Sequence, residues 1–582
     1  MKTTDYIADS LINLGVKNVY AITGGAVMHI LDSFKKKKLN IIFCHHEQAA
    51  LLAATTEARV NNTIGCAVVT QGPGVTNAIT GLAAAWFDSI PCIVFSGQAR
   101  TDLFTKKHLK VRQLAPQSFN INKLVKSLSK EIFTPKNLDD FCKNYHKKLL
   151  SLTNPRPGPV WIDIPVDIQW SNIKLSNIDK PNFFKKQKYI SKNKIIKFTD
   201  LVYQSKKPLL LIGSGIKLSK SEIEFKRFYK NNKMPVISSW NAADIIDNSE
   251  NLYIGRPGIF GQRGANYIIQ QSDLIICLGT GLGAGLTTYN FKDFGRNAKK
   301  IFINIDADEL NTPRFKIDLK WKLDLKEFFK MFQTKKIVNL NSDWIKYSKK
   351  IKKMNLLTFK RNLKKDGKAD PYLFCDHISK LSKNKKTIFC VDGGGIITQV
   401  APQMLMLSKK HKMNISAGIC TMGCLPEALG AKVAKKNHDV IFLSGDGSMM
   451  MNLQELQTIN HYKQNIKIFI IANKIYGLMK IAQKSFFDKY YVGSTKKSGV
   501  SFPNFKKISQ IFDFSYFRID NNKDILEKLP HIMKQKKKLI CEINVSDNFK
   551  MNPLFSTRII NGKKIQPTLD EMEPYLKINE KV

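Results

Sequence analysis

The sequence predicts an α/β protein that contains three parallel-sheet domains. Three blocks of the 582-residue chain each alternate short apolar runs with helical patterns, which is typical of parallel α/β domains. A chain of this length is also too long for a single hydrophobic core. The first and third blocks have similar size and patterning, so we expect two related domains on either side of a middle domain.

The apolar runs locate the strands of each predicted domain. Residues 1–170 contain NVYAIT, NIIFC, GCAVVT, PCIVFSG and GPVWIDIP, and a polar, lysine-rich linker follows. Residues 190–335 contain KPLLLIGSG, PVISSW, LIICLGTG and KIFINIDAD, and a charged stretch of roughly 313–367 precedes the third block. Residues 368–550 contain TIFCVDGGG, HDVIFLSGDGS, IKIFIIAN and LICEINV, and residues 551–582 form a tail.

The composition argues against several classes of protein. The formal charge of +46 comes from 93 Lys+Arg against 47 Asp+Glu, but the lysines are scattered and form no stripe with interleaved aromatic residues. We therefore expect a solvated surface and neither a nucleic-acid nor a membrane partner. Ten cysteines without C-x-x-C spacing indicate reduced thiols. With no apolar run as long as a membrane span and no signal-peptide pattern, a cytoplasmic enzyme is expected.

The sharpest local motif lies in the third block. A strand at 440–443 runs into Ser444-Gly445-Asp446-Gly447-Ser448, and the next strand, 466–472, ends at Asn473. Adjacent parallel strands would bring Asp446 and Asn473 together at their carboxyl ends, where open α/β sheets bind ligands.

The residue types of this motif suit a phosphate and a metal ion. Gly445 and Gly447 allow a close approach of the backbone, and Ser448 begins a helix whose free N–H groups suit phosphate. Asp446 and Asn473 offer the hard oxygen ligands that Mg²⁺ prefers. The alternative is a glycine turn beside an unrelated asparagine at the end of a strand.

A second motif, NIIFCHHEQAALLAA, places Glu47 between an apolar strand and an apolar helix. A carboxylate in such surroundings is costly unless it is paired or functional. His45 and His46 are candidate acid/base groups, although a histidine at the end of a strand is more often structural.

Nearly the whole chain resembles the thiamine diphosphate-dependent enzymes, in the order found in the acetolactate synthase family. The resemblance rests on the following stretches: ITGGAVMHILDSF, HHEQAALLAA, VVTQGPGVTNAITGLAAAWFDSIPCIVFSGQ, RPGPVWIDIPVD, GICTMGCLPEALGAKVA, SGDGS with its downstream asparagine, and TLDEMEPYL. It implies a pyrimidine-binding domain, a Rossmann-like middle domain and a diphosphate-binding domain, with thiamine diphosphate and Mg²⁺ as cofactors.

The resemblance also implies roles for individual residues. Glu47 would hydrogen-bond N1′ of the aminopyrimidine and exchange a proton with it, and Met422 would support the bent cofactor. Mg²⁺ would be held by Asp446, Asn473 and the carbonyl of Ile475. The other residues implied to contact the cofactor or the reacting centre are Gly25, Gly72, Gln117, Gly394, Gly395, Ile396, Thr421, Gly445, Gly447 and Ser448. Gly72 could instead simply form a turn, and Met422 could be an ordinary core residue.

Two departures from the family concern the acceptor and a second cofactor. Ala482 occupies the position where acetolactate synthases carry a tryptophan that selects a 2-oxo acid acceptor. The middle-domain segment TGLGAGLTTYN lacks the family's arginine, whereas GSG and INIDAD keep a nucleotide-binding character, so FAD stays an open alternative.

These features lead to one main hypothesis and several alternatives. The main hypothesis is a decarboxylating carboligase that uses pyruvate as donor and a carbonyl compound as acceptor. A keto-sugar nucleotide is one candidate acceptor, as in some members of a group of relatives associated with surface polysaccharides. A true acetolactate synthase, a simple 2-oxo-acid decarboxylase and a non-catalytic protein of the same fold are the alternatives. The resemblance further implies at least a homodimer with each site between two chains.

Overall fold

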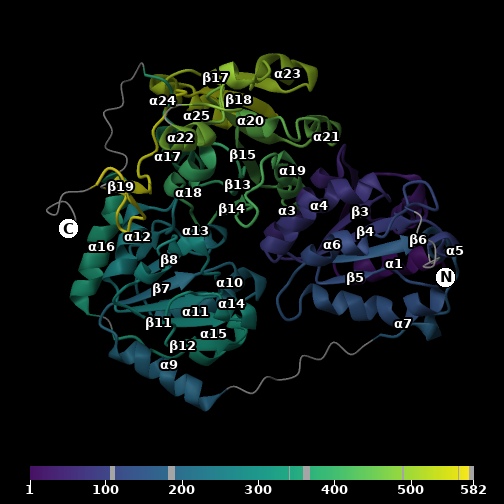
Figure 1. Ribbon diagram of the computed structural model, residues 1–582, viewed down its shortest axis with the longest axis horizontal. Helices are drawn as coiled ribbons and strands as arrows, with labels where there is room; N and C mark the ends of the chain where they lie inside the picture. Colours follow the sequence, from purple (N-terminus) through teal and green to yellow (C-terminus); the bar gives the residue numbers. More distant parts are fainter. Residues whose placement is uncertain are drawn as a thin grey trace.

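The computed structural model describes residues 1–104, 112–180, 191–339, 341–357, 367–487, 490–560 and 563–575. Three six-stranded sheets dominate it, every strand pair within them is parallel, and helices cover both faces of each sheet (Figure 1). The predicted α/β fold class is therefore confirmed.

The first sheet has the strand order β2-β1-β3-β4-β6-β5. Its strands are β1 (Asn18–Ala21), β2 (Asn40–Phe43), β3 (Gly65–Val69), β4 (Cys92–Gln98), β5 (Glu131–Phe133) and β6 (Val160–Pro165). One face packs against α3 (Glu47–Asn61) and α4 (Pro73–Phe87). The other face packs against α1 (Thr3–Asn13), α2 (Met28–Lys36), α7 (Leu138–Leu149) and α8 (Val166–Trp170).

The third sheet has the order β14-β13-β15-β16-β18-β17, which repeats the first sheet's order strand for strand. Its strands are β13 (Thr387–Val391), β14 (His411–Ile415), β15 (Asp439–Gly445), β16 (Ile466–Ala472), β17 (Ser515–Ile519) and β18 (Leu539–Asn544). One face packs against α19 (Leu425–Ala434), α21 (Glu455–His461) and α23 (Phe505–Ile511). The other face packs against α17 (Pro371–Ser382), α18 (Ile397–Met404), α24 (Asn522–Glu527) and α25 (Leu529–Lys534).

The middle sheet has the order β12-β11-β10-β7-β8-β9. Its strands are β7 (Pro208–Ile212), β8 (Val236–Ser238), β9 (Tyr253–Gly255), β10 (Leu274–Leu278), β11 (Lys299–Asn304) and β12 (Leu319–Lys322). Helices α9 (Lys192–Gln204), α11 (Glu222–Asn231) and α15 (Leu325–Phe332) pack against one face. Helices α12 (Arg263–Gln271) and α16 (Ser342–Leu357) pack against the other.

The first and third sheets share one apolar core through the helices between them. Helix α3 from the first sheet lies against α19 from the third, and buried side chains of α3, α4, α19 and α21 belong to the same cluster as side chains of both sheets. The approach of α3 to α19 is close, because a Cβ on Gly430 would overlap the backbone of Ala53. This packing fixes the orientation of the two sheets relative to each other.

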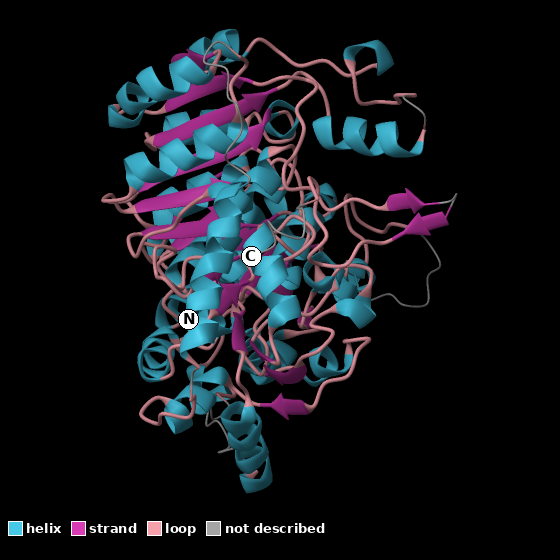
Figure 2. Cartoon of the chain, turned by 90° about the vertical axis from the view of Figure 1, so that its left-hand side faces the viewer, coloured by secondary structure: helices cyan, strands magenta, loops and turns pink. Residues whose placement is uncertain are grey.

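The C-terminal segment lies against the middle domain. The Arg263 side chain donates to the carbonyls of Met572, at 2.9 Å, and Glu573, and Leu569 and Met572 are buried. An antiparallel hairpin of β19 (Arg558–Ile560) and β20 (Lys563–Ile565) projects from the body of the molecule in Figure 2. Among helices in the described ranges, none combines the length and apolar character needed to cross a bilayer.

Candidate active site

Glu47 lies at the carboxyl edge of the first sheet, where it begins α3. Its side chain is 9% exposed, and Asn77 Nδ2, from α4, donates to Glu47 Oε2 at 3.0 Å. None of the ion pairs within the described ranges includes this carboxyl group. Glu47 is thus a nearly buried acid with one hydrogen-bonding neighbour, and it keeps lone pairs for a further donor.

The two neighbouring histidines have structural contacts. His46 caps the N-terminus of α3, because its Nδ1 accepts a hydrogen bond from the Gln48 backbone at 3.1 Å. The backbone N–H of His45 donates to Glu455 Oε1, on α21, at 3.0 Å. The His46 contact is the structural alternative that the sequence left open.

Gly72 and Gln117 meet beside Glu47. Gly72 adopts a left-handed φ of 64°, and a Cβ there would lie only 2.7 Å from Gln117 Cβ, so only glycine fits at this position. Two residues further, a Cβ on Gly74 would contact Thr70 Cγ2 at 2.9 Å and Glu47 Oε1 at 3.4 Å.

Gly25 belongs to the same edge of the sheet. It follows Gly24, where a Cβ would lie 2.5 Å from Thr70 Oγ1. The chain therefore brings Gly25, Glu47, Gly72 and Gln117 around the turn that follows β3. These are the predicted residues of the pyrimidine-binding side, and we call them the acid half-site.

Asp446 and the strand-end Asn473 lie together at the carboxyl edge of the third sheet. Asp446 starts the short helix α20 (Asp446–Met449), and its carboxylate accepts from the backbone N–H groups of Gly447 at 2.9 Å and Lys474 at 2.6 Å. Both Asp446 and Asn473 are buried, and Ile475 follows in the loop before α22 (Gly477–Phe486). Burial raises the pKa of Asp446 to about 7, although the two backbone N–H groups favour its charge.

The diphosphate loop predicted from the resemblance lies beside this aspartate. A Cβ on Gly394 would overlap both the Met422 side chain and the Ser448 hydroxyl, and a Cβ on Gly395 would lie 3.5 Å from Gly445 Cα. The Ser448 hydroxyl is buried and has no hydrogen-bond partner within the described ranges. Three separate loops, which contain Gly394-Gly395, Met422 and residues 445–448, therefore meet at one place, which we call the cradle.

The remaining predicted residues border the same cradle. The Ile396 side chain and the Asn473 amide both face Gly477, where a Cβ would lie 3.3 Å from Ile396 Cδ1 and 2.7 Å from Asn473 Nδ2. A Cβ on Gly393 would overlap the carbonyl of Thr421. We call Gly394, Gly395, Ile396, Thr421, Met422, Gly445, Asp446, Gly447, Ser448, Asn473 and Ile475 the metal half-site.

The metal half-site fits a Mg²⁺–diphosphate group by its donor chemistry. A carboxylate, an amide oxygen and a backbone carbonyl are hard oxygen ligands, and Mg²⁺ commonly completes its shell with phosphate oxygens and water. The unpartnered Ser448 hydroxyl can donate to a phosphate oxygen. Within the described ranges, no cluster of three or more His, Cys, Asp or Glu side chains offers a competing metal site.

Sequence reasoning missed several residues that support these half-sites. Asp392 is fully buried, accepts a hydrogen bond from Ser444 Oγ at 2.6 Å, and has a pKa that burial raises to about 6. Its position directly before Gly393-Gly394-Gly395 at the end of a strand was a usable signal. Asn77 and Thr70, in contrast, become noticeable only when the fold brings them against Glu47 and Gly74.

The two half-sites of one chain lie at opposite ends of α3. Arg59, in the last turn of this helix, donates to the carbonyl of Ile415, which ends β14 and precedes the loop that carries Met422. Glu47 begins the same helix, about 18 Å away along its axis at 1.5 Å per residue. Within a single chain, Glu47 therefore does not face the cradle.

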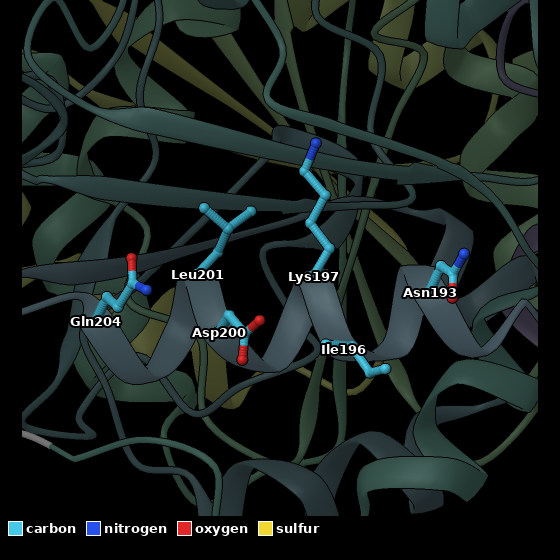
Figure 3. Close-up of a pocket in the computed structure, with 6 residues that line it drawn as sticks. All are labelled: Asn193, Ile196, Lys197, Asp200, Leu201 and Gln204. Atoms are coloured by element: carbon cyan, nitrogen blue, oxygen red, sulfur yellow. The ribbon is translucent and has the colours of Figure 1, made fainter.

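A separate hollow of about 330 Å³ lies in the middle domain, along α9 (Figure 3). All of its lining residues come from this one helix: Asn193, Ile196, Lys197, Asp200, Leu201 and Gln204. An open groove along a single helix lacks the converging polar groups of a reaction site. We therefore do not consider this groove a candidate reaction site.

Comparison with known proteins matches three parts of the chain to one family. Residues 1–117 match the thiamine pyrophosphate enzyme N-terminal TPP binding domain, residues 195–332 its central domain, and residues 393–543 its C-terminal TPP binding domain. These three matches follow the order of the three sheets.

Similar curated proteins cover nearly the full chain. The acetolactate synthase large subunit of Cyanidium caldarium is 29% identical over 569 residues, which is 93% of each chain. That of Lactococcus lactis is 28% identical and covers 96% of this chain and 95% of its own. Acetolactate synthase isozyme 2 large subunit of Escherichia coli is 26% identical and covers 97% and 100%. The chain thus belongs to the thiamine pyrophosphate (thiamine diphosphate) enzyme family and is a thiamine diphosphate-dependent enzyme of the acetolactate synthase-like kind.

Proposed function

We propose that this enzyme decarboxylates a 2-oxo acid, with pyruvate as donor, and joins the remaining two-carbon unit to the carbonyl group of an acceptor. The observation that carries this proposal is that one chain holds both half-sites, with a nearly buried Glu47 bonded to Asn77 in one and Asp446 beside Asn473 in the other. The names of the acetolactate synthase relatives support a 2-oxo acid donor and a ligation step.

The metal half-site would hold the cofactor by its diphosphate end. Asp446, Asn473 and the carbonyl of Ile475 would bind Mg²⁺, and the Ser448 hydroxyl would donate to a phosphate oxygen. When bound, thiamine diphosphate supplies an electron sink that allows the carboxylate of a 2-oxo acid to leave as CO₂. The glycines of the half-site allow its loops to lie close together, because a Cβ on Gly394 or Gly447 would overlap neighbouring side chains.

The acid half-site would donate and accept the proton that the reaction requires. Glu47 is nearly buried, so it can give a proton to a ring nitrogen and take it back without competition from bulk water. Asn77 fixes the orientation of its carboxyl group through the bond to Oε2. Gln117, beside Gly72, would contact the reacting atoms from the same side.

A second copy of the chain would complete each site. The separation of Glu47 from the cradle along α3 supports this, since the acid half-site of one chain needs the metal half-site of another. We therefore propose at least a homodimer in which each site contains Glu47 from one chain and Asp446 from its partner.

Ala482 on α22 supports an acceptor bulkier than pyruvate, such as a keto-sugar nucleotide. Met479, Ala482 and Phe486 lie on one face of this helix by their spacing, and Met479 and Phe486 are 52% and 61% exposed. An alanine between them leaves space that the tryptophan of acetolactate synthases would fill. Pyruvate as acceptor, which would make the protein an acetolactate synthase, is the second candidate and is favoured by the relatives' names.

FAD is the alternative that the sequence left open for the middle domain. The loops that contain GSG and TGLG meet at the carboxyl edge of its sheet, where the N–H of Gly215 donates to the carbonyl of Gly279 at 2.9 Å. Flavin absorbance of the purified protein tests this prediction directly.

The function is tested by ThDP- and Mg²⁺-dependent release of CO₂ from pyruvate. We expect slow release with pyruvate alone and faster release when a keto-sugar nucleotide is added, with the two-carbon unit found on the sugar. Abundant acetolactate from pyruvate alone would contradict the bulky acceptor. Absence of release from any common 2-oxo acid would contradict the decarboxylation itself. Replacement of Ala482 by Trp should raise the share of acetolactate among the products.

A further inference from the structure

The loop that carries Gln117 is held by a single buried amide, that of Gln98. Gln98 ends β4 and is 1% exposed, and its Nε2 donates to the Phe119 carbonyl and to Asp163 Oδ2, both at 3.1 Å. Its Oε1 accepts from Ser118 Oγ at 2.9 Å and from the Ala99 backbone at 3.0 Å. The amide thus binds the two residues that directly follow Gln117.

Asp163 fixes which way this amide points. It lies on β6 opposite Ser96 of β4, is fully buried, and accepts from Ser96 Oγ at 2.6 Å on the oxygen that Gln98 does not use. Trp161 Nε1 donates in turn to Ser96 Oγ at 2.8 Å. The two oxygens of Asp163 accept from Ser96 and from the NH₂ group of Gln98, so Oε1 of Gln98 faces Ser118.

The other side of Gln117 is held by the turn after β3. Gln71 Nε2 donates to the Pro116 carbonyl at 2.8 Å, and a Cβ on Gly72 would press on the Gln117 Cβ. Gln117 itself has a φ of 60°, which is unfavourable for a residue with a side chain. The positions on both sides of Gln117 must therefore be fixed for this conformation to persist.

We propose that Gln98, oriented by Asp163, is a positioning residue that holds Gln117 against Gly72 for the reaction. Within the described ranges, the side chain of Gln98 is hydrogen-bonded to Ala99, Ser118, Phe119 and Asp163, none of which is a predicted site residue. The proposal rests on the role proposed above for Gln117 and deepens it, because it explains how the left-handed conformation is maintained. It also gives a role to Asp163, a buried carboxylate in the first sheet that is otherwise unexplained.

The first test needs no cofactor. Hydrogen exchange of the full chain is followed by mass spectrometry in wild type and in Gln98→Leu. We expect peptides covering 112–121 to exchange at least about tenfold faster in the variant, while peptides of β3 and α4 keep their rates. Unchanged exchange of 112–121 would overturn the proposal.

The matched control is Gln270→Leu. Gln270 is equally buried and also holds a loop, because its Oε1 accepts from the Gly295 backbone at 2.9 Å and its Nε2 donates to Asp293, but it lies in the middle domain. We expect this variant to leave peptides 112–121 and turnover unchanged. If Gln98→Leu and Gln270→Leu loosened 112–121 equally, Gln98 would have only a general structural role.

The second test separates positioning from stability by a double-mutant cycle with Gln117→Ala. We expect Gln98→Leu to lower kcat roughly 10- to 100-fold with little change in the ThDP and Mg²⁺ concentrations needed for activation, which depend on the other half-site. In a protein that already carries Gln117→Ala, adding Gln98→Leu should lower kcat hardly any further. If the fall in kcat of the double variant equalled the product of the falls in the two single variants, the proposal would be overturned.

A milder variant covers the case in which Gln98→Leu fails to fold. Ser118→Ala removes only the bond from Ser118 Oγ to Gln98, and we expect about a 3- to 5-fold fall in kcat with an unchanged melting temperature. A wild-type rate in this variant would contradict the proposal. Absence of activity in the wild-type protein would instead contradict the proposed function, and the exchange experiment would still decide the role of Gln98.

Discussion

The first and third sheets share one strand order, but the residues at their carboxyl edges have opposite properties. In the first sheet, the amide that ends the fourth strand, Gln98, has all of its hydrogen-bonding groups occupied by the protein. In the third sheet, the corresponding amide, Asn473, directly follows β16, and its Oδ1 accepts one long bond of 3.4 Å from the Ile475 backbone. At the same place in the topology, the amide of one domain is therefore used fully by hydrogen bonds within the protein, whereas the amide oxygen of the other can bind a metal ion.

The acidic residues of the two sheets, Glu47 and Asp446, differ in their hydrogen-bond donors. The first sheet places Glu47 at a helix start with one neutral hydrogen-bond donor, which suits proton exchange. The third sheet places Asp446 at a strand end with two backbone N–H donors, which favour the charged form that a metal ion requires. A duplicated fold can thus divide cofactor binding and proton transfer between its copies.

The largest effect is expected from Asp446→Ala, which removes the charged ligand of the metal half-site. The affinity for Mg²⁺ and thiamine diphosphate should fall roughly 10³-fold, as for loss of a buried charged contact worth about 4 kcal/mol. The rise in melting temperature on adding both cofactors should disappear. A cofactor-dependent rise equal to that of wild type would show that the metal is bound elsewhere.

Glu47→Gln is expected to impair the acid half-site and leave cofactor binding by the metal half-site intact. Turnover should fall about 10²- to 10³-fold, because the amide exchanges no proton, while Mg²⁺- and ThDP-dependent thermal stabilisation remains. Steady-state kinetics and thermal melts measure the two effects on the same samples. A near-wild-type rate would refute the role of Glu47, and loss of stabilisation would show that the half-sites are not independent.

Asp163→Asn tests the buried anchor of the first sheet through pH. Burial raises the pKa of Asp163 to about 7, so the native protein keeps a proton that the unfolded chain releases near pH 4. The contribution of Asp163 to stability should therefore be complete below about pH 4. Wild type should lose a few kcal/mol of stability relative to Asp163→Asn as the pH rises from about 4 to about 7. Melting temperatures from pH 4 to 9 measure this difference, and curves that stay parallel would contradict it.

The smallest effect is expected from Ser448→Ala. The Ser448 hydroxyl is buried and has no hydrogen-bond partner among the residues that the structure describes. Its removal should therefore leave the melting temperature of the cofactor-free protein unchanged or slightly higher. The apparent affinity for thiamine diphosphate should fall about 5- to 10-fold, which corresponds to about 1 kcal/mol, the net value of a typical hydrogen bond. An unchanged affinity would remove Ser448 from the phosphate cradle.

In the three six-stranded sheets, the strands that sequence patterning did not identify all lie at the edges. They are β5, β9, β12, β14 and β17. Central strands are buried on both faces and form continuous apolar runs, as in the Ile-rich β16. Edge strands are shorter or mix polar and apolar residues, as in Leu319–Lys322 with its alternating burial, and pairing on only one side permits this.

The sequence by itself determined the fold class, the order of the domains and the grouping of the strand-end motifs. This was possible because apolar periodicity and strand-end chemistry are local properties of the chain. Only the tertiary structure decided which distant residues support these motifs, such as Asn77 on Glu47 and Asp163 on Gln98. It also decided that Glu47 and the metal half-site of one chain lie at opposite ends of α3. These relations depend on strand register and on the packing of α3 against α19, which no short stretch of sequence encodes.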